Sequence, residues 1–424
     1  MHHFSYKAGV LHAEDVDLPA LAEQVGTPFY CYSTATLQRH YRVFADAFQG
    51  SDALVCYSIK SNSNLAVLRT LGALGSGMDV VSAGELRRAR AAGIPAERIV
   101  FSGVGKTREE IAYALDEGIF AFNVESEGEL RAMSEVAASR GATARIAFRV
   151  NPDVDAKTHH KISTGRAGDK FGVPWREAPR LYNLARDLPG IAPLGVHMHI
   201  GSQITDLGPL ANAFALIAEL VGMLREAGHR IEFVNAGGGL GVPYRDDTEA
   251  PPRPELYAAV VRDKLALLDC RLLFEPGRMI TANAGILVSR VIYRKTSGEK
   301  RFLIVDAAMN DLIRPTLYDA YHEIWPVSEA KPGAPREVCD VVGPICESSD
   351  YFAKARALPP TAEGALIAIM TAGAYGAVQS SSYNSRLLVP EVLVNGGEWA
   401  IVRQRPDFDE MLKSECLAPW QGRA

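Results

Sequence analysis

A lysine, a glycine-rich loop, an arginine and a glutamate have the residue types that together hold a phosphorylated cofactor. Lys60 follows Cys56-Tyr57-Ser58-Ile59, an apolar run that predicts a strand, so its amine is placed as a nucleophile for a Schiff base. Gly237-Gly238-Gly239-Leu240-Gly241 follows another such run, and glycines let backbone N–H groups close on an anion. Arg278 could clamp the same phosphate, and Glu275 could bond a protonated ring nitrogen.

Each of these features also has a structural interpretation. Lys60 could be a strand-end lysine whose stem covers apolar surface, the glycines could form a simple turn, and Glu275 could pair with Arg278. A nucleophilic amine, a phosphate clamp and an acid for a pyridinium nitrogen nevertheless describe pyridoxal phosphate, whose ring acts as an electron sink. We therefore expect pyridoxal 5'-phosphate as the cofactor.

Strands that end on a common face are needed to bring these groups together. From about residue 53, short β-branched runs alternate with amphipathic stretches, which is typical of parallel strands joined by helices. The expected strands are 53–59, 77–81, 98–102, 119–124, 144–150, 194–200, 231–235 and 272–275, and the helical stretches include 83–92, 107–117, 126–139 and 210–227. Eight such units favour a TIM barrel over an open doubly wound sheet, which typically has about five to seven strands.

The residues that end these strands are polar. In a TIM barrel the active site lies at the C-terminal ends of the strands. The polar groups there are Lys60, Asp79, Ser102, Asn123 with Glu125, Arg149 with Asn151, His197 with His199, Asn235, and Glu275 with Arg278. The sequence therefore predicts one reactive face at this end of the barrel.

After Gly277 the alternation of strands and helices stops. Residues 285–293 and 302–306 flank a Thr296-Ser297-Gly298 turn and predict a β-hairpin, and 337–342 and 365–370 predict further strands. We expect a separate antiparallel domain here. The first thirty or so residues contain a strand-like Val10-Leu11-His12, and from the sequence they could pack on either part.

Composition excludes several classes of protein. The 424 residues are 47% hydrophobic and 22% charged, and the net charge is −5, so the chain can bury a large core and has no basic field for nucleic acid. The longest uncharged run, 364–385, is too polar for a bilayer core. Six sparse cysteines without paired spacing, and an N-terminus without a secretory pattern, predict free thiols in the cytoplasm.

Two motifs imitate other sites. Gly103-Val104-Gly105-Lys106-Thr107 resembles the end of a P-loop, but the pattern needs a glycine at position 100, where the chain has Val100. We predict a turn there, with Thr107 as a helix cap. His197-Met198-His199 could hold a metal in a barrel hydrolase, but a metal would also need matched carboxylate or cysteine ligands. We expect no metal, and a structural role for His197.

Motifs spread over nearly the whole chain carry a strong family resemblance. They are Gly26-Thr27-Pro28-Phe29-Tyr30, Tyr57-Ser58-Ile59-Lys60-Ser61-Asn62, His197-Met198-His199-Ile200-Gly201-Ser202, Glu275-Pro276-Gly277-Arg278, Arg314-Pro315-Thr316-Leu317-Tyr318, Cys346-Glu347-Ser348-Ser349-Asp350 and Gly373-Ala374-Tyr375-Gly376. Together they resemble the pyridoxal-phosphate-dependent decarboxylases of the alanine racemase fold type. The resemblance implies a barrel over residues 33–279, a β-sandwich-like domain formed by 1–32 and 280–424, and a homodimer with two shared active sites.

The resemblance also implies roles for individual residues. Lys60 resembles the cofactor-binding lysine, His199 the residue that stacks on the pyridine ring, and Glu275 the partner of the ring nitrogen. The other expected cofactor-binding residues are Asp79, Ser202, Gly237, Gly238, Gly239, Gly277, Arg278 and Tyr375. Cys346 resembles a thiol from the partner subunit that reprotonates the α-carbon, although without the family context it could be an ordinary small buried residue.

The substrate expectation rests on Arg314, Tyr318 and Glu347, with Arg278 and Tyr375 as further contacts. The first three resemble the groups that hold the distal amino-acid end of meso-2,6-diaminopimelate, because a zwitterion needs a guanidinium for its carboxylate and an acid for its ammonium. The expected reaction forms L-lysine and carbon dioxide, the last step of lysine biosynthesis. The alternatives are decarboxylation of ornithine, lysine or carboxynorspermidine, or a non-catalytic regulator on the same fold.

One segment departs from the family pattern. Residues 158–165 resemble the active-site lid, but Lys161 stands where an aromatic residue is often found. This difference affects the expected lid contacts and leaves the expected chemistry unchanged.

Overall fold

A computed structural model describes residues 2–156, 164–165, 168–245 and 251–421 of the chain. The chain divides into two compact units. One comprises Thr34–Ala284, and the other combines His2–Ser33 with Gly285–Ala424.

The first unit is a closed parallel barrel. Its eight strands within the described residues are β5 (Ala53–Ser58), β6 (Gly77–Val80), β7 (Ile99–Phe101), β8 (Ala121–Val124), β9 (Ala144–Asn151), β11 (Ile191–His197), β12 (Phe233–Asn235) and β13 (Arg271–Phe274). All neighbouring pairs are parallel, and the circle closes because β13 pairs with β5 and β8 pairs with β9. Short β10 (Val173–Pro174) adds to β9 from outside the circle. The predicted TIM barrel is confirmed.

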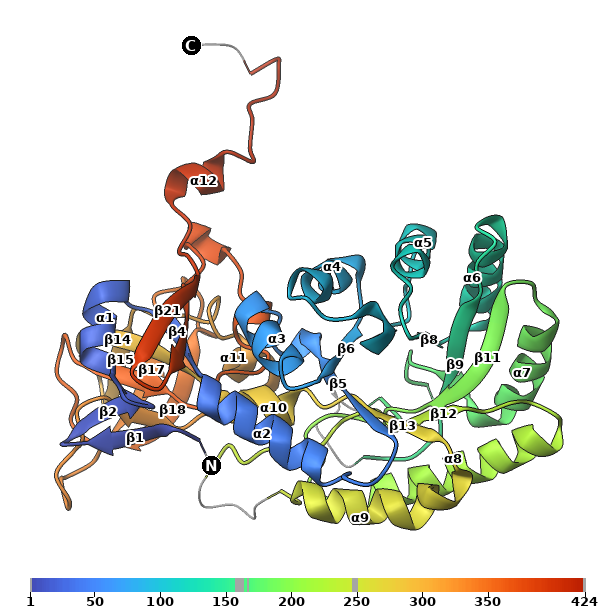
Figure 1. Ribbon diagram of the computed structural model, residues 1–424. Coiled ribbons are helices and arrows are strands. Elements are labelled where there is room, and N and C mark those ends of the chain that lie inside the picture. Colours follow the sequence, from blue (N-terminus) through green and yellow to red (C-terminus); the bar gives the residue numbers. More distant parts are fainter. Residues whose placement is uncertain (1, 157–163, 166–167, 246–250, 422–424) are drawn as a thin grey trace. The chain divides into compact units, whose positions relative to one another are not determined.

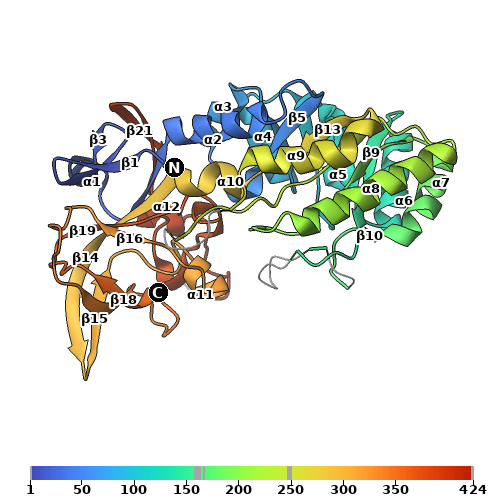
Figure 2. The ribbon, with the colours of Figure 1, turned by 90° about the horizontal axis from the view of Figure 1, so that it is seen from below.

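Helices cover the outside of the barrel strands (Figures 1 and 2). They are α2 (Thr34–Asp46), α3 (Leu65–Gly72), α4 (Ala83–Ala91), α5 (Arg108–Glu117), α6 (Glu127–Ser139), α7 (Ala178–Asp187), α8 (Gly208–Glu226) and α9 (Pro254–Leu265). Thr107 caps α5 as predicted, and its hydroxyl and Glu110 form a reciprocal capping box. The start of α5 is thus fixed by a side chain in the loop after β7.

The sixth barrel strand begins and ends earlier than predicted. We expected 194–200, but β11 runs from Ile191 to His197, with an irregular register between Pro193 and Gly195. Pro193 has no backbone N–H, and a proline within an apolar run argues against a strand, so the sequence pattern placed the start of this strand too late. As a consequence, His199 lies beyond the strand end, in the loop.

Helix α8 is, within the described ranges, the one helix that has the length and apolar composition of a membrane span. Its apolar character has another physical explanation. Leu210, Phe214, Ile217, Leu220 and Leu224 recur at helical spacing and are buried, so they form the face that packs on the barrel unit.

The inward-facing side chains of the barrel change from apolar to polar along six of its eight strands. An apolar cluster includes Leu54, Cys56, Val100, Ala121, Ala147, Phe233 and Leu273. Because side chains on a strand alternate in direction, the next inward residue lies two positions on. Those residues are Ser58, Ser102, Asn123, Arg149, Asn235 and Glu275. The barrel therefore has an apolar floor and a polar layer at its C-terminal end.

The second unit is built on a mostly antiparallel sheet. Along its main path the order is β18 (Tyr351–Leu358), β17 (Glu337–Val342), β15 (Lys300–Val305), β14 (Gly285–Ser297), β4 (Phe29–Ser33), β20 (Glu391–Asn395) and β21 (Glu398–Arg403), with β19 (Leu366–Ile369) joining β14 to β16 (Ile324–Pro326). The predicted hairpin is β14–β15, which is antiparallel. Two pairs, β15–β17 and β20–β4, are parallel, which the expectation of an antiparallel domain did not include.

The N-terminal segment belongs to this second unit. Strand β4 is hydrogen-bonded between β14 and β20, and a small sheet of β1 (Phe4–Lys7), β2 (Val10–Ala13) and β3 (Val16–Asp17) precedes α1 (Leu18–Val25). Phe4, Leu11 and Phe29 are buried in one apolar cluster with Ile286 and Val392. Packing thus settles which part of the chain the first thirty residues join.

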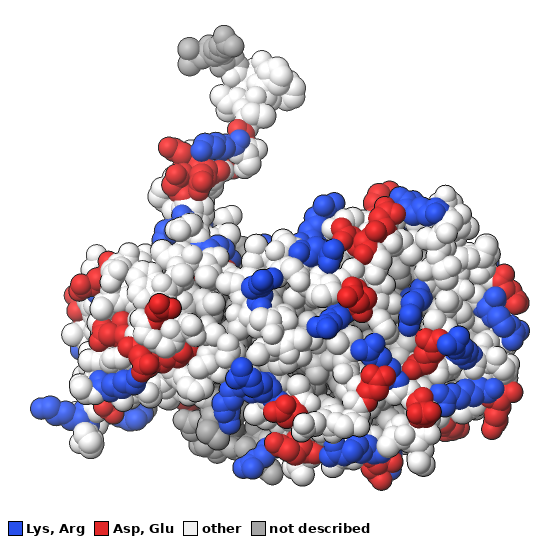
Figure 3. Space-filling model, viewed as in Figure 1, with Lys and Arg blue, Asp and Glu red and all other residues white. Residues whose placement is uncertain are grey.

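Charges of both signs are mixed on the surface. Figure 3 shows Lys and Arg interspersed with Asp and Glu over the visible face, in agreement with the small net charge. This face has no extended basic field of the kind that nucleic acid would require.

Candidate active site

Glu275 lies at the centre of the polar layer of the barrel. Its Oε1 accepts hydrogen bonds from the amides of Asn235 at 2.6 Å and Asn123 at 3.0 Å, and its Oε2 lies 3.2 Å from Nε2 of His197. Burial alone would raise the pKa of Glu275, but His197, Lys60 and the Asn235 amide outweigh burial and hold this pKa well below its usual range. The side chain is a buried, ionised carboxylate.

Lys60 is paired with a second buried carboxylate. It lies in the short helical turn Ile59–Ser61 directly after β5, and its Nζ donates to Oδ2 of Asp79 at 3.1 Å. Ser58 donates to the same oxygen at 2.5 Å. Burial, reinforced by the charge of Glu275, raises the pKa of Asp79. The Lys60 side chain is 38% exposed, so the amine is held by protein on one side and is accessible on the other.

His199 is a neutral imidazole held by the glycine-rich loop. The backbone N–H of Gly238 donates to Nδ1 of His199 at 3.2 Å, so Nδ1 is an acceptor and the ring proton is on Nε2. Burial, together with the nearby charges of Arg149 and Lys60, lowers the pKa of His199 well below its usual value. The ring therefore presents a flat, uncharged face.

The loop after β12 requires its glycines for close backbone approach. A Cβ at Gly237 would lie 2.2 Å from the carbonyl of Met198, and one at Gly238 would lie 2.1 Å from the carbonyl of Glu275. Gly239 has a φ of +117°, which other residues rarely adopt. The amides of Gly237 and Gly238 already donate to Asn235 and His199, so the loop orients these two side chains as well.

Gln203, which the sequence did not indicate, is hydrogen-bonded to the end of this loop. The side-chain amide of Gln203 donates to the carbonyl of Val242 at 2.7 Å and accepts from its N–H at 3.2 Å. The pair ties the segment after β11 to the glycine-rich loop. Only the spatial arrangement of the two loops reveals this contact, because the residues are 39 positions apart in sequence.

Arg278 begins the short helix α10 (Arg278–Thr281) and is bonded to two hydroxyls. Its Nε and one terminal nitrogen donate to Oγ of Ser202 at 3.2 and 3.1 Å, and the other donates to the Tyr244 hydroxyl at 2.7 Å. The alternative in which Arg278 pairs with Glu275 is not the arrangement observed, since Glu275 pairs with His197. Tyr244 is a further residue that sequence analysis missed.

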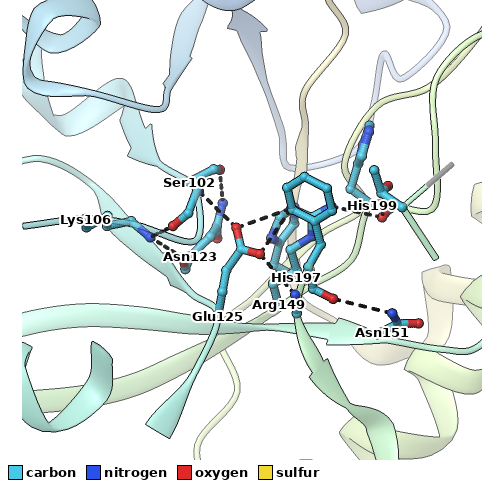
Figure 4. A network of polar contacts seen from close by, with 12 residues as sticks. Ser102, Lys106, Asn123, Glu125, Arg149, Asn151, His197 and His199 are labelled. Carbon is cyan, nitrogen blue, oxygen red and sulfur yellow. Dashed lines mark hydrogen bonds and ion pairs between the residues drawn. The ribbon is translucent and has the colours of Figure 1, made fainter. Parts of the chain in front are cut away.

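A second buried network supports the backbone of His199. Arg149 forms an ion pair with Glu125 at 3.2 Å and also donates to the His199 carbonyl at 3.3 Å. In Figure 4, Glu125 lies between Lys106 and Arg149. Lys106 itself is 1% exposed and donates to Glu129 at 2.8 Å. The lysine of the apparent P-loop is thus an internal structural group.

In the β unit, Arg314 and Tyr318 begin and end the short helix α11 (Arg314–Tyr318). Arg314 is 5% exposed, and one of its terminal nitrogens lies 3.0 Å from Nε2 of His322. Tyr318 is partly exposed. The sequence analysis did not identify His322, which is fully buried.

Cys346 and Glu347 lie on an exposed loop of the β unit. Glu347 accepts from the hydroxyls of Tyr383 at 2.6 Å and Ser349 at 2.8 Å, and these bonds lower its pKa. The backbone N–H of Cys346 donates to the side chain of Asn384 at 3.0 Å. The Cys346 thiol is exposed within the chain, unlike the small buried residue that was the alternative.

Tyr375 follows β19 in the same unit and has a φ of +55°. A Cβ at the next residue, Gly376, would lie 2.5 Å from the carbonyl of Ala372, so the turn is tightly packed. A non-glycine residue in the left-handed region is typical of functional sites, where packing offsets the strain.

The barrel residues fit a phosphorylated pyridine aldehyde. Lys60 offers an accessible primary amine, Glu275 an ionised carboxylate for a ring N–H, and Arg278 a cation for phosphate. The buried Oδ1 atoms of Asp79 and Asn123 have no hydrogen-bond partner within the described residues, so both could accept a hydrogen bond from a bound ligand. Each group that the cofactor needs is thus present in the barrel unit.

The metal alternative finds little support in the geometry. His197 and His199 are engaged by Glu275 and by the Gly238 N–H. In the part of the chain that is described, no group of three or more His, Cys, Asp or Glu side chains is arranged to hold an ion. The predicted lid is mostly outside the described residues; its last two residues, Thr164 and Gly165, pack against the His199–Ile200 backbone.

Comparison with known proteins identifies the class of enzyme. Residues 34–282 match the family model of the pyridoxal-dependent decarboxylase, pyridoxal binding domain. The chain is a pyridoxal-phosphate-dependent decarboxylase, in agreement with the barrel and its polar layer.

The relatives define the family within this class. The chain is 49% identical over 420 residues to diaminopimelate decarboxylase of Zymomonas mobilis, covering 98% of this chain and 99% of the relative. It is 48% identical to diaminopimelate decarboxylase of Pseudomonas aeruginosa, covering 99% and 100%. The crystal structure of diaminopimelate decarboxylase from M. jannaschii in co-complex with L-lysine matches with a TM-score of 0.94 at 36% identity, covering 99% of each chain. The chain belongs to the diaminopimelate decarboxylase family.

Proposed function

We propose that this enzyme converts meso-2,6-diaminopimelate to L-lysine and carbon dioxide, the last step of lysine biosynthesis. The observation that carries the proposal is the buried guanidinium of Arg314, which would bind the carboxylate of a zwitterionic substrate end. The carboxylate of Glu347, next to Cys346, would bind the ammonium of that end. Tyr318 adds a hydroxyl at the end of α11. Relatives of similar length carry the name diaminopimelate decarboxylase, which supports this substrate.

The barrel residues hold the cofactor in this proposal. Lys60 would form the covalent link, and Ser202 and Arg278 would bind the phosphate. The glycines of residues 237–239 would let the backbone approach the phosphate, and Gly277 would allow close approach next to Ser58 and Ser61. Asp79 keeps the Lys60 amine in place. By the family resemblance, Tyr375 would contact the cofactor and, together with Arg278, the substrate.

The chemistry needs an electron acceptor and a fixed proton. When bound, pyridoxal phosphate supplies an electron sink for the electron pair left behind as the carboxylate departs. Glu275, whose ionised form is favoured by the nearby His197, would hold a proton on the ring nitrogen and so would favour this delocalisation. The neutral ring of His199 would stack on the cofactor and would add no competing positive charge.

Cys346 completes the reaction by delivering a proton to the α-carbon. We infer that it acts in the active site of a partner subunit, in a homodimer with two shared sites. The exposure of the thiol, and its place on a loop fixed by Asn384, support this role. All six cysteines are free thiols, which favours the reducing cytoplasm as the location of the enzyme.

A decarboxylation assay on the purified holoenzyme tests the substrate. We expect carbon dioxide release from meso-diaminopimelate and little from lysine, ornithine or arginine, because lysine and ornithine would place only an ammonium near Arg314. A clear preference for ornithine would show that the distal-end assignment is wrong and that the enzyme acts on another basic amino acid.

A further inference from the structure

The guanidinium of Arg314 is bonded to a neutral ring nitrogen in the interior of the β unit. Arg314 is 5% exposed and His322 is fully buried, and the distance between the terminal nitrogen of Arg314 and Nε2 of His322 is 3.0 Å. Arginine is a donor only, so Nε2 of His322 must be the acceptor. The bond therefore requires an imidazole without a proton on Nε2.

The other side of the imidazole fixes this tautomer. Nδ1 of His322 lies 2.8 Å from the carbonyl oxygen of Met370, which can only accept. The ring proton is thus on Nδ1, and Nε2 keeps its lone pair for Arg314. His322 is itself fixed by its chain, because its own carbonyl accepts from Arg356 at 2.8 Å.

The chemical nature of the acceptor affects what Arg314 can bind. A carboxylate at this position would orient the guanidinium but would also neutralise it and compete with any anionic ligand. A neutral imidazole orients the guanidinium and does not itself cancel its positive charge. Arginine also offers five N–H donors in a rigid fork, so a single bond to His322 fixes the orientation of the whole guanidinium plane.

We propose that His322 is a specificity-determining positioning residue, which fixes the Arg314 guanidinium through a neutral nitrogen so that its charge selects substrates with a distal carboxylate. The inference rests on the proposed function, in which Arg314 binds the distal end of the substrate. It adds that selection for a distal carboxylate depends on the neutral state of His322, which acts through Arg314 and not by contact with the substrate.

Two ligands of the holoenzyme isolate the distal carboxylate. L-Lysine retains the distal amino-acid end, and 1,5-diaminopentane is the same molecule without the carboxylate. Titration calorimetry on the wild type is expected to show tighter binding of lysine. In His322→Phe the acceptor is lost, and we expect lysine to bind about tenfold or more weakly, with binding of 1,5-diaminopentane unchanged. The KM for meso-diaminopimelate should rise while kcat changes little.

Two conservative variants separate positioning from simple packing. His322→Gln keeps a neutral acceptor, so it should retain most of the preference for lysine. His322→Glu keeps an acceptor but neutralises Arg314, so it should lose the preference. This pair tests the inference even if His322→Phe does not fold. Tyr321→Phe is the matched control. Tyr321 precedes His322 in the chain, and the substitution removes only a hydroxyl that donates to Glu323, so the preference for lysine should stay unchanged.

The results distinguish this inference from the proposed function. If the wild type binds the two ligands equally, the distal-end role of Arg314 is wrong. If the wild type prefers lysine and His322→Glu keeps that preference in a folded holoenzyme, the role of His322 is wrong and the proposed function stands.

Discussion

Nε2 of His197 lies 3.2 Å from Oε2 of Glu275 within the polar layer of the barrel, and both side chains are almost completely buried. The sequence predicts only a structural role for His197. It also allows a salt bridge between Glu275 and Arg278, which the structure does not show. The observed pair explains how a carboxylate surrounded by protein stays ionised. Among the groups that oppose the effect of burial on the pKa of Glu275, His197 is the strongest.

Replacing His197 by Asn is expected to change the pH dependence of turnover. The pKa of Glu275 lies well below its usual range, so its ionised form persists in the wild type as the pH falls. Without His197 this pKa rises, and the acidic limb of the kcat profile should move to higher pH. His229→Asn is the control, because that histidine bonds Asn183 elsewhere in the barrel unit. An acidic limb at the wild-type position in His197→Asn would contradict the inferred role.

Lys60→Ala is expected to abolish turnover and the visible absorbance of the bound cofactor. Borohydride treatment of the wild type, followed by peptide mapping, should place the mass of the cofactor on Lys60. Lys264→Ala removes an exposed lysine from α9 and should change neither property. Retention of turnover in Lys60→Ala would overturn the assignment.

Arg278→Gln should weaken cofactor binding. Hydrogen bonds to charged groups contribute about 1.5–3 kcal/mol, which corresponds to roughly 10–100-fold in the dissociation constant. Titration of the apoenzyme with pyridoxal phosphate measures this change. Arg108→Gln removes an exposed guanidinium that pairs with Glu135 and is the control. Equal affinity in Arg278→Gln and in the wild type would exclude a phosphate contact.

Cys346→Ala should lower kcat by roughly 10²–10⁴-fold, the usual contribution of a general acid, while the absorbance of the bound cofactor stays. Cys416 is the other exposed thiol and provides a control. Iodoacetamide should inactivate both the wild type and Cys416→Ser, and meso-diaminopimelate should protect them. Protection by Cys416→Ser itself would show that the wrong thiol was assigned.

Mixing two inactive variants tests the shared active site. If Cys346 acts in the site of the partner subunit, a mixed dimer of Lys60→Ala and Cys346→Ala has one intact site. Random reassociation of equal amounts should restore about a quarter of the wild-type activity. Sedimentation measures the dimer in parallel, and a dimeric mixture without activity would place Cys346 and Lys60 in the same subunit's site.

The sequence by itself determined the barrel and the face on which its chemistry lies. Strand alternation has a period of two, so a run such as Leu54-Val55-Cys56-Tyr57-Ser58 shows both its apolar floor and its polar end without any knowledge of its neighbours. The cofactor followed from residue types, because an amine, a carboxylate and a guanidinium at strand ends have few other uses in combination.

Tertiary structure decided which residues are partners. The contacts between His197 and Glu275, Arg149 and Glu125, and Gln203 and Val242 depend on barrel closure and loop paths, which a one-dimensional pattern does not contain. Strand β4 was not predicted, because it lies outside the repeated strand–helix pattern and pairs with β14 and β20, which are far away in the sequence. His322 gave no sequence pattern at all. Its inferred role depends on two contacts of the folded chain. Nδ1 donates to the Met370 carbonyl, and Nε2 accepts from the Arg314 guanidinium.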